Sequence, residues 1–194
     1  MIDIYNSYSD KAYRFLTFEG LLKTLEDDSL RLTRADNFND PLDNSPLIAP
    51  FEWREFKKMG YNYINTITEY SFNKIFSSTY ICCFSKEYDN ENSYLMWSHY
   101  SDSHKGVCFE IDFSKNIDLL DTPSNVEYPD DLLSVRENLR ITKEQNVGLF
   151  LVTNKLKVWK YEKEVRIIVD IENEKFDSSS SKISTNLKHL FYKI

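Results

Sequence analysis

Glycine and proline are scarce in this chain, which has four glycines and five prolines among 194 residues. Because both residues interrupt regular structure, their scarcity indicates long helices and strands joined by few tight turns. No apolar run approaches the roughly 18 residues that a membrane-spanning helix requires. The first residues, MIDIYNSYSDKAYRF, lack the basic and apolar regions of a signal peptide. We therefore expect a cytoplasmic protein with no membrane contact.

Cysteine and histidine are also few. Cys82, Cys83 and Cys108 are odd in number, two are adjacent, and all three lie in apolar runs, so a disulfide framework is not expected. Three histidines and the lack of a C-x-x-C pair leave little for a zinc site, and we expect no bound metal. A nucleophilic Cys82 or Cys83 acting with His99 is an alternative. Thiols between apolar neighbours, however, usually serve in packing.

Positive charge is in the minority, since the formal net charge is −7 and the pI is about 5.1. Such a chain lacks the general attraction to phosphate backbones on which non-specific nucleic-acid binders depend. A local basic group is formed by Lys155, Lys157, Lys160, Lys163 and Arg166. We interpret these residues as solvated side chains that flank a strand.

What the chain does have is enough apolar material for a sizeable core. Apolar residues make up 41% and aromatic residues 15% of the sequence, so disorder is not expected. There is no internal repeat, and no linker is rich enough in polar residues to divide two domains. We expect a single domain over residues 1–194.

Residue patterns predict strands toward both ends of the chain and helices between them. Runs of β-branched and aromatic residues predict strands over 13–15, 30–33, 79–85, 106–113 and 158–171. Helical spacing predicts a short helix capped by Thr17 and helices over 51–76, 93–100 and 131–156. A polar loop over 173–182 and a helix or last strand over 186–192 complete the chain. This order indicates an α+β fold rather than a regular βαβ alternation.

The segment Trp159–Arg166 carries the strongest candidate for chemistry. In a strand, residues two apart share a face, so Glu162, Glu164 and Arg166 are predicted to lie together on the central sheet. Two carboxylates roughly 7 Å apart beside a guanidinium raise one pKa and lower the other. Such a pair suits a site that stabilises a developing cation and holds a sugar hydroxyl. The alternative is a solvated strand face with weak cross-strand ion pairs.

Two further segments are candidates. His99 and Tyr100, near the end of the predicted helix 93–100, offer a ring to stack on a flat ligand and a donor for a ligand oxygen. The alternative is a packed helix whose histidine caps a carbonyl. The segment 37–41, Asn-Phe-Asn-Asp-Pro, favours a rigid structured loop, with direct ligand contact as the less favoured interpretation.

Taken in order, these segments are familiar as a set. They are Tyr-Arg-Phe at 13–15, Leu-Arg-Leu-Thr at 30–33, the loop at 37–41, Cys-Phe-Ser at 83–85, Met-Trp-Ser-His-Tyr at 96–100, His-Lys-Gly-Val at 104–107 and Trp-Lys-Tyr-Glu-Lys-Glu-Val-Arg at 159–166. The set resembles the bacterial domain of unknown function 2971 family over about residues 10–170, with helical insertions over about 51–76 and 131–156. Ser101 and Val165 depart from it, since the family usually has Ala and Trp there.

A remoter likeness is to the ADP-ribosyltransferase superfamily. That superfamily has an Arg or His on an early strand, a Ser or Tyr element in the middle, and Glu-x-Glu or a lone Glu on a late strand. Arg14, then Ser85 or His99-Tyr100, then Glu162-Lys163-Glu164 occur here in that order. The likeness implies a split two-sheet β core of roughly 6–8 strands with flanking helices. It also implies NAD as a substrate, a protein or nucleic acid as acceptor, and a stress or phage-defence role.

The likeness assigns a role to each candidate. Glu164 holds the ribose hydroxyl and stabilises an oxocarbenium-like transition state, while Glu162 orients the acceptor. Arg14 grips the pyrophosphate and Tyr100 stacks on nicotinamide. Tyr13, Ser85 and His99 complete the cofactor-binding set, and Arg166 completes the catalytic one. Because the chain has no Gly-x-Gly-x-x-Gly, a Rossmann mode of NAD binding is not expected.

Two other classes of function stay open. Aromatic-rich helices over 51–76 and 131–156 are typical of a non-catalytic protein-interaction module, with the Glu-Arg segment serving the fold. A metal-dependent nuclease is the third hypothesis, built on Asp36, Asp40, Asp43, Glu162 and Glu164. The acidic balance of the chain disfavours it.

Overall fold

The computed structural model describes residues 11–40, 42–44, 69–89, 91, 93–115, 123–131, 134, 147–172, 176–184 and 191–193. The helices are α1 (Phe18–Glu26), α3 (Glu69–Ser78), α4 (Ser93–Tyr100) and α6 (Val147–Leu151), with single turns of 3-10 helix at η1 (Ala35–Asn37) and η4 (Phe113–Lys115) and a longer one at η6 (Lys157–Glu162). The strands are β1 (Lys11–Leu16), β2 (Ser29–Arg31), β3 (Thr33–Arg34), β4 (Thr79–Ser85), β5 (Val107–Asp112), β6 (Ser124–Asn125), β7 (Glu164–Asp170), β8 (Phe176–Asp177), β9 (Lys182–Ser184) and β10 (Phe191–Lys193).

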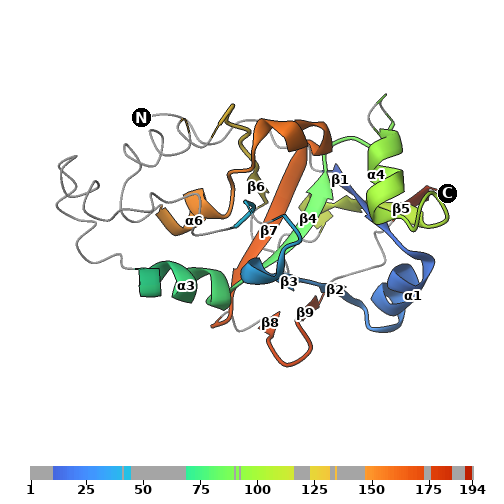
Figure 1. Cartoon of the computed structure of the whole chain (residues 1–194). Coiled ribbons are helices and arrows are strands. Elements are labelled where there is room, and N and C mark those ends of the chain that lie inside the picture. Colours follow the sequence, from blue (N-terminus) through green and yellow to red (C-terminus); the bar gives the residue numbers. More distant parts are fainter. Residues whose placement is uncertain are drawn as a thin grey trace.

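These strands form two antiparallel sheets. The larger has seven strands in the order β10-β5-β1-β4-β7-β6, with β3 paired to β4, and the smaller has three in the order β2-β9-β8. In Figure 1, β4 and β7 run side by side through the middle of the molecule, while α1 and α4 lie toward the β1 and β5 side. Helices and antiparallel sheets together confirm the α+β class, and the described strands outnumber the roughly 6–8 that were predicted.

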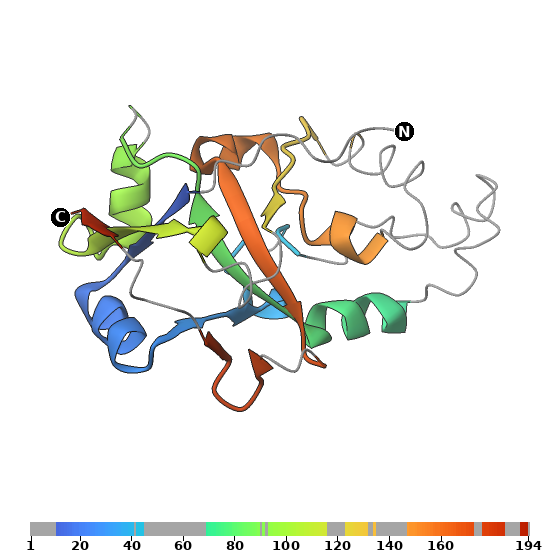
Figure 2. The same ribbon diagram turned by 180° about the vertical axis from the view of Figure 1, so that it is seen from behind.

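The hydrophobic core lies between the two sheets. Alternate residues of β4, β5 and β7 point into it, and the smaller sheet covers them with Leu30, Phe176 and Ile183. The rings of Tyr80 and Phe176, one from each sheet, have centroids 4.5 Å apart. Figure 2 shows the β8–β9 hairpin beyond one end of β7, near the cyan-to-blue β2 and β3 segment. Because alternation buries one face of β7, its other face is left for polar side chains.

The large sheet opens between β1 and β4. All six residues of β1 pair with β5, and all seven of β4 pair with β7, but β1 and β4 pair only at Tyr13 and Ser85. Lower on β4, the partner is β3, through Thr33 opposite Ile81 and Arg34 opposite Tyr80. β4 thus pairs with β1 at one end and with β3 nearer the other end. We call the opening between β1 and β4 the fork.

Several local predictions are confirmed. Thr17 caps α1 by accepting a hydrogen bond from the Gly20 amide at 3.0 Å, α4 covers 93–100, and β4 covers 79–85. Of the predicted helix or last strand over 186–192, residues 186–190 lie outside the described residues, and Phe191–Lys193 form the strand β10. Among the described residues no helix is long and apolar enough to cross a membrane.

The predicted strand over 158–171 is wrong in its first half. Residues Lys157–Glu162 form η6, and β7 begins only at Glu164. Lys163 between them adopts a left-handed conformation, with φ 44° and ψ 50°. Lysine rarely takes this conformation and no glycine marks the turn, so the alternation of aromatic and charged residues imitated a strand.

Three other boundaries differ. The segment 30–33 is not one strand, because β2 belongs to the smaller sheet and β3 to the larger, with the buried Leu32 between them. The predicted helix over 131–156 ends at Leu151 in the described part, and 135–146 lie outside the described residues. Of 51–76, only 69–76 is described, as part of α3. The predicted loop over 173–182 contains the β8–β9 turn.

Candidate functional site

A pocket of about 340 Å³ occupies the fork between β1 and β4. Its walls come from β1, from β4 between Ile81 and Ser85, from Asn37–Asn39 at the end of η1, and from the end of α4. Its lining residues are Tyr13, Arg14, Phe15, Leu16, Thr33, Asn37, Phe38, Asn39, Ile81, Cys83, Phe84, Ser85, Met96, Tyr100, Lys155, Glu162 and Glu164. The volume lies at the lower end of the range for small-molecule sites.

Glu162 and Glu164 both reach this pocket, although they come from different elements. Glu164 is the first residue of β7, opposite Ser85, and Glu162 is the last of η6. The Tyr100 hydroxyl donates a hydrogen bond to Glu162 Oε1 at 2.6 Å, and the Tyr128 hydroxyl accepts one from the Glu164 amide at 2.7 Å. The two carboxylates thus converge through a turn and not through strand alternation, which corrects the predicted geometry.

Arg166 lies beneath the pocket with all of its donors used. Nε donates to Glu164 Oε1 at 2.7 Å, Nη1 to the Asn44 side-chain oxygen and the Val152 carbonyl, and Nη2 to both Asp43 oxygens. Its side chain is 0% exposed. A guanidinium with every donor engaged cannot also bind a ligand, so Arg166 positions Glu164 and does not line the pocket.

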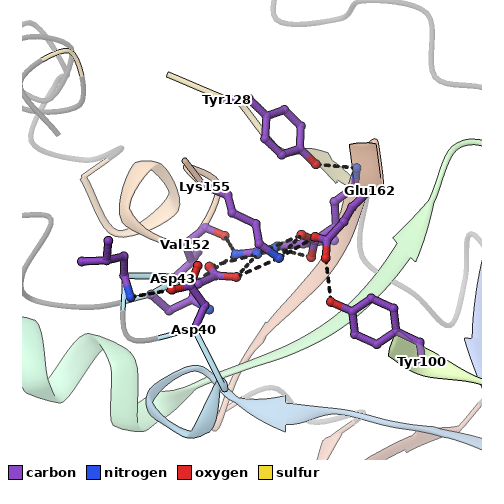
Figure 3. A network of polar contacts seen from close by, with 11 residues as sticks. Asp40, Asp43, Tyr100, Tyr128, Val152, Lys155 and Glu162 are labelled. Carbon is purple, nitrogen blue, oxygen red and sulfur yellow. Dashed lines mark hydrogen bonds and ion pairs between the residues drawn. The ribbon is translucent and has the colours of Figure 1, made fainter. Parts of the chain in front are cut away.

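Lys155 bridges three carboxylates at the centre of the site. Its ammonium lies 2.5 Å from Glu162 Oε2, 3.3 Å from Asp43 Oδ2 and 3.4 Å from Glu164 Oε2. Figure 3 shows this side chain passing between the Asp43 and Glu162 groups. The three carboxylates exceed the two cations by one, so the described cluster carries a formal charge of −1 when ionised.

Burial and charge separate the two glutamates. Desolvation alone would raise the pKa of Glu164, but the charges of Arg166 and Lys155 outweigh it and lower that pKa to about 2. For Glu162, desolvation outweighs the opposing Lys155 charge, and the pKa is raised. Glu164 is therefore an anion at neutral pH, while Glu162 is the carboxylate that takes up a proton more readily.

The predicted cofactor-binding residues are distributed around the pocket. Tyr13 and Ser85 are register partners on its β1 and β4 walls. Arg14, on the opposite face of β1 from Tyr13, borders the pocket through the fork; its Nη2 donates to the Arg31 carbonyl at 3.0 Å. Within the described part of the chain, Arg14 forms no ion pair, which leaves its charge available for an anionic group.

His99 lies outside this group. It is exposed and does not line the pocket, and its ring centroid lies 6.1 Å from that of Tyr100 and 6.4 Å from that of Tyr161. On a helix, adjacent residues point about 100° apart, so only one of the pair can face the pocket. Of these two predicted cofactor-binding residues, only Tyr100 lines the pocket.

The basic residues of this region separate into two kinds. Lys155 and Arg166 are buried in the site, whereas Lys157 pairs with Asp130 and Lys163 with Glu87. The interpretation of the whole group as solvated charges is wrong for the first two. No local pattern marks Lys155 as a buried residue, apart from the apolar run Leu149–Val152 that precedes it.

The site also contains three residues that the sequence analysis did not identify as hydrogen-bond partners of its charged groups. They are Asp43, Asn44 and Tyr128. Asp43 and Asn44 come from the loop after η1, and they bond Arg166 across 123 and 122 residues of sequence. Contacts over such separations leave no local periodicity. The loop at 37–41 was interpreted as a rigid turn, and its Asn37, Phe38 and Asn39 also line the pocket.

The acids of the nuclease hypothesis do not gather at one point. Asp36 pairs with Arg34, and Asp40 accepts a hydrogen bond from the Leu42 amide. The other three acids face Lys155 and Arg166. No group of three or more His, Cys, Asp or Glu side chains suited to a metal ion occurs among the described residues.

The structure also argues against a nucleophilic role for Cys82 or Cys83. None of the three cysteines, all of which are described, forms a disulfide. Burial raises the pKa of Cys83 well above its ordinary value, and the charge of Glu164 adds to the effect. Burial also raises the pKa of Cys82, which lies on the core face of β4. Neither thiol is ionised at neutral pH, so neither is an activated nucleophile.

Fold and site together define an α+β protein whose antiparallel sheet forks around a pocket with a buried, ion-paired glutamate pair at its floor. Residues 96–167 match the family described as Protein of unknown function (DUF2971), which confirms the family resemblance over that segment. The segment contains Tyr100, Lys155, both glutamates and Arg166. No curated protein and no solved structure gives a significant match to the chain.

Proposed function

We propose that the pocket binds NAD and that the protein cleaves the bond between nicotinamide and ribose, as ADP-ribosyltransferases do. The observation that carries the proposal is that Arg14, Tyr100 and Glu164, which lie far apart in sequence, line one pocket together with Glu162. The forked sheet with a second small sheet behind it also supports an ADP-ribosyltransferase-like fold.

Glu164 supplies the charge that the reaction needs. Cleavage breaks the C–N glycosidic bond, its electron pair leaves with neutral nicotinamide, and positive charge develops on the ribose ring. A carboxylate held ionised and oriented by Arg166 and Lys155 stabilises that charge without reorganising. Its remaining acceptor capacity also suits a ribose hydroxyl.

Glu162 completes the chemistry on the acceptor side. The oxocarbenium carbon is captured by an oxygen or nitrogen of water or of a macromolecule, and the proton of that nucleophile has to leave. Glu162, whose burial raises its pKa above the ordinary value, is suited to receive it. The hydrogen bond from Tyr100 holds the carboxylate in place.

The rest of the pocket suits the remainder of the substrate. The rings of Tyr13, Phe38 and Tyr100 offer faces for the flat nicotinamide. Arg14 offers a positive charge to the pyrophosphate at the β1 side of the fork.

Binding is tested by thermal unfolding of wild type and variants with NAD, ADP-ribose and nicotinamide. We expect NAD to raise the unfolding temperature in a concentration-dependent manner, as any ligand of the folded state must. Arg14→Met should weaken NAD and ADP-ribose but not nicotinamide. Arg34→Met is the matched control, because Arg34 is a partly exposed cation of the same sheet outside the pocket. No shift with NAD in wild type would refute the proposal.

Transfer and hydrolysis are separated by Glu162→Gln. If Glu162 handles the acceptor, this variant should lose ADP-ribose transfer to proteins or nucleic acids of a cell lysate more than it loses NAD hydrolysis. Equal losses in both would contradict the role of Glu162 while leaving that of Glu164 in place.

A further inference from the structure

Lys155 is the only cation within ion-pair distance of Glu162 in the described residues. Glu164, by contrast, has Arg166 as well, through two of its donors. Lys155 itself is 7% exposed and follows α6 in a segment held by a bridge between Glu127 and Asn154. One ammonium thus separates two carboxylates that the fold brings to the same place.

We propose that Lys155 is a positioning residue, which keeps the Glu162 and Glu164 carboxylates separately ionised and aimed into the pocket. Without its ammonium, two buried carboxylates would face each other, and one would hold a proton that the pair shares. The effect on turnover rests on the proposed function, whereas the effect on the protonation of the two glutamates does not.

The surroundings of the pair assign this role to Lys155. Besides the lysine, six titratable or charged groups face the glutamate pair. They are Asp43 from the loop, Cys83 from β4, Tyr100 from α4, Tyr128 after β6, Tyr161 from η6, and Arg166 from β7. Of these only Arg166 is a cation, and its donors are already engaged by Glu164, Asp43, Asn44 and Val152. Glu162 therefore has no second source of positive charge among them.

A neighbouring aromatic ring helps to hold the Lys155 ammonium in place. Its ammonium lies 5.0 Å from the centroid of the Trp159 ring, which covers it on one side through a cation–π contact. Desolvation opposes the charge on the lysine, but Glu164, Asp43 and Glu162 outweigh it and raise its pKa. The lysine consequently stays charged throughout the pH range in which the glutamates titrate.

The first test needs no ligand. The unfolding temperatures of wild type, Lys155→Met and the charge-balanced Lys155→Met/Glu162→Gln are measured between about pH 5 and about pH 8. In Lys155→Met, folded Glu162 keeps a proton that the unfolded chain releases, so its stability should fall as pH rises. The double variant lacks that proton and should fall no more steeply than wild type. Equal pH slopes for all three proteins would overturn the proposal.

Failure of the single variant to fold is also decisive. A Lys155→Met protein that is folded near pH 5 but unfolded near pH 8 shows the same proton uptake in a stronger form. A single and a double variant that are both unfolded at both pH values would mean that the fold requires Lys155 for a reason other than the protonation of Glu162, which contradicts the proposal.

The second test restores the ammonium from solution. Nicotinamide release by Lys155→Ala should be about 10²–10³ lower than in wild type, the usual effect of losing one preorganised electrostatic group. Ethylammonium should restore it at least about tenfold, whereas tetramethylammonium at the same ionic strength, which has no N–H donors, should not. Equal responses to the two salts would overturn the positioning role. If wild type releases no nicotinamide, the proposed function fails and the pH comparison still decides the role of Lys155.

Discussion

Tyr100 and Glu162 lie 62 residues apart in sequence and are joined by a 2.6 Å hydrogen bond from the tyrosine hydroxyl to Oε1 of the carboxylate. The bond links the last residue of α4 to the last residue of η6, so it closes one side of the pocket. Burial and the neighbouring Glu162 charge raise the pKa of Tyr100, and its hydroxyl remains a donor at neutral pH.

Tyr100→Phe should destabilise the protein by roughly 1.5–3 kcal/mol, because a buried carboxylate loses a hydrogen-bond donor. Urea unfolding at neutral pH measures the change. Tyr161→Phe is the matched control, since no hydrogen bond of the Tyr161 hydroxyl occurs in the described part of the chain, and it should change stability little. A similar loss in both variants would show that the hydrogen bond to Glu162 contributes nothing of its own.

Arg166→Met should lower the stability by about 3–5 kcal/mol, since Glu164 and Asp43 would each lose a buried cation. For a chain of this size that corresponds to roughly 6–20 °C in Tm. Arg166→Lys keeps the charge but not the planar array of donors, so it should fall between wild type and Arg166→Met. Arg34→Met removes a half-exposed ion pair and should cost less than about 1 kcal/mol. Comparable Tm losses at the two arginines would contradict the described network.

Gly106→Ala should destabilise by at least about 2 kcal/mol. A Cβ at this position would lie 2.1 Å from the Leu16 carbonyl oxygen and 2.9 Å from Ser101 Cα, and both are backbone atoms that cannot rotate away. Gly148→Ala in α6 is the control, because its nearest neighbour would be Ile75 Cγ2 at 4.0 Å. That change should be neutral or stabilise by up to about 1 kcal/mol. Thermal unfolding distinguishes the two, and a harmless Gly106→Ala would mean that β1 and the turn before β5 are less closely packed.

Acid should weaken wild type more than Glu164→Gln. The folded pKa of Glu164 is about 2 against an ordinary value of 4.5, so its contribution is present above about pH 4.5 and is lost as pH falls toward 2. That difference corresponds to about 3 kcal/mol. The raised pKa of Glu162 has the opposite effect on stability. Its protonation favours the folded state, and this contribution changes only when the pH rises above the ordinary pKa of a glutamate. Chemical unfolding at about pH 7 and about pH 3 measures the loss, and parallel losses in both proteins would contradict the ion-paired state of Glu164.

Much of the fold follows from local patterns. The apolar, β-branched run at 79–85 can satisfy its backbone and bury its side chains only as a central strand, and it does so as β4. Alternation places Val107, Phe109 and Ile111 of β5 in the core. The Thr17 cap, likewise, depends only on residues close to it in sequence.

The site follows from local sequence patterns to a smaller extent than the fold does. The convergence of Glu162 on Glu164 depends on the left-handed Lys163, and periodicity suggested a continuous strand there. Asp43 has no local feature that distinguishes it from a surface charge, because it is buried through its contact with Arg166 across 123 residues of sequence. Lys155 meets Glu162 and Glu164 only 7 and 9 residues away, but only because η6 and the left-handed Lys163 turn the chain back toward it. Only the order of the family segments brought Tyr100 and the glutamates together before the structure did.

The most direct test of the proposed function is nicotinamide release from NAD, followed in parallel for wild type, Glu164→Gln and Glu110→Gln. Glu110 is a matched control, since it is a buried carboxylate that pairs with Lys11 and does not line the pocket. Each rate is expressed per folded molecule, because both substitutions remove the charge of a buried carboxylate. We predict that wild type and Glu110→Gln release nicotinamide at similar rates and that Glu164→Gln is about 10²–10³ slower. Release by Glu164→Gln at the wild-type rate, or none by wild type, would contradict the assignment of this pocket to NAD cleavage.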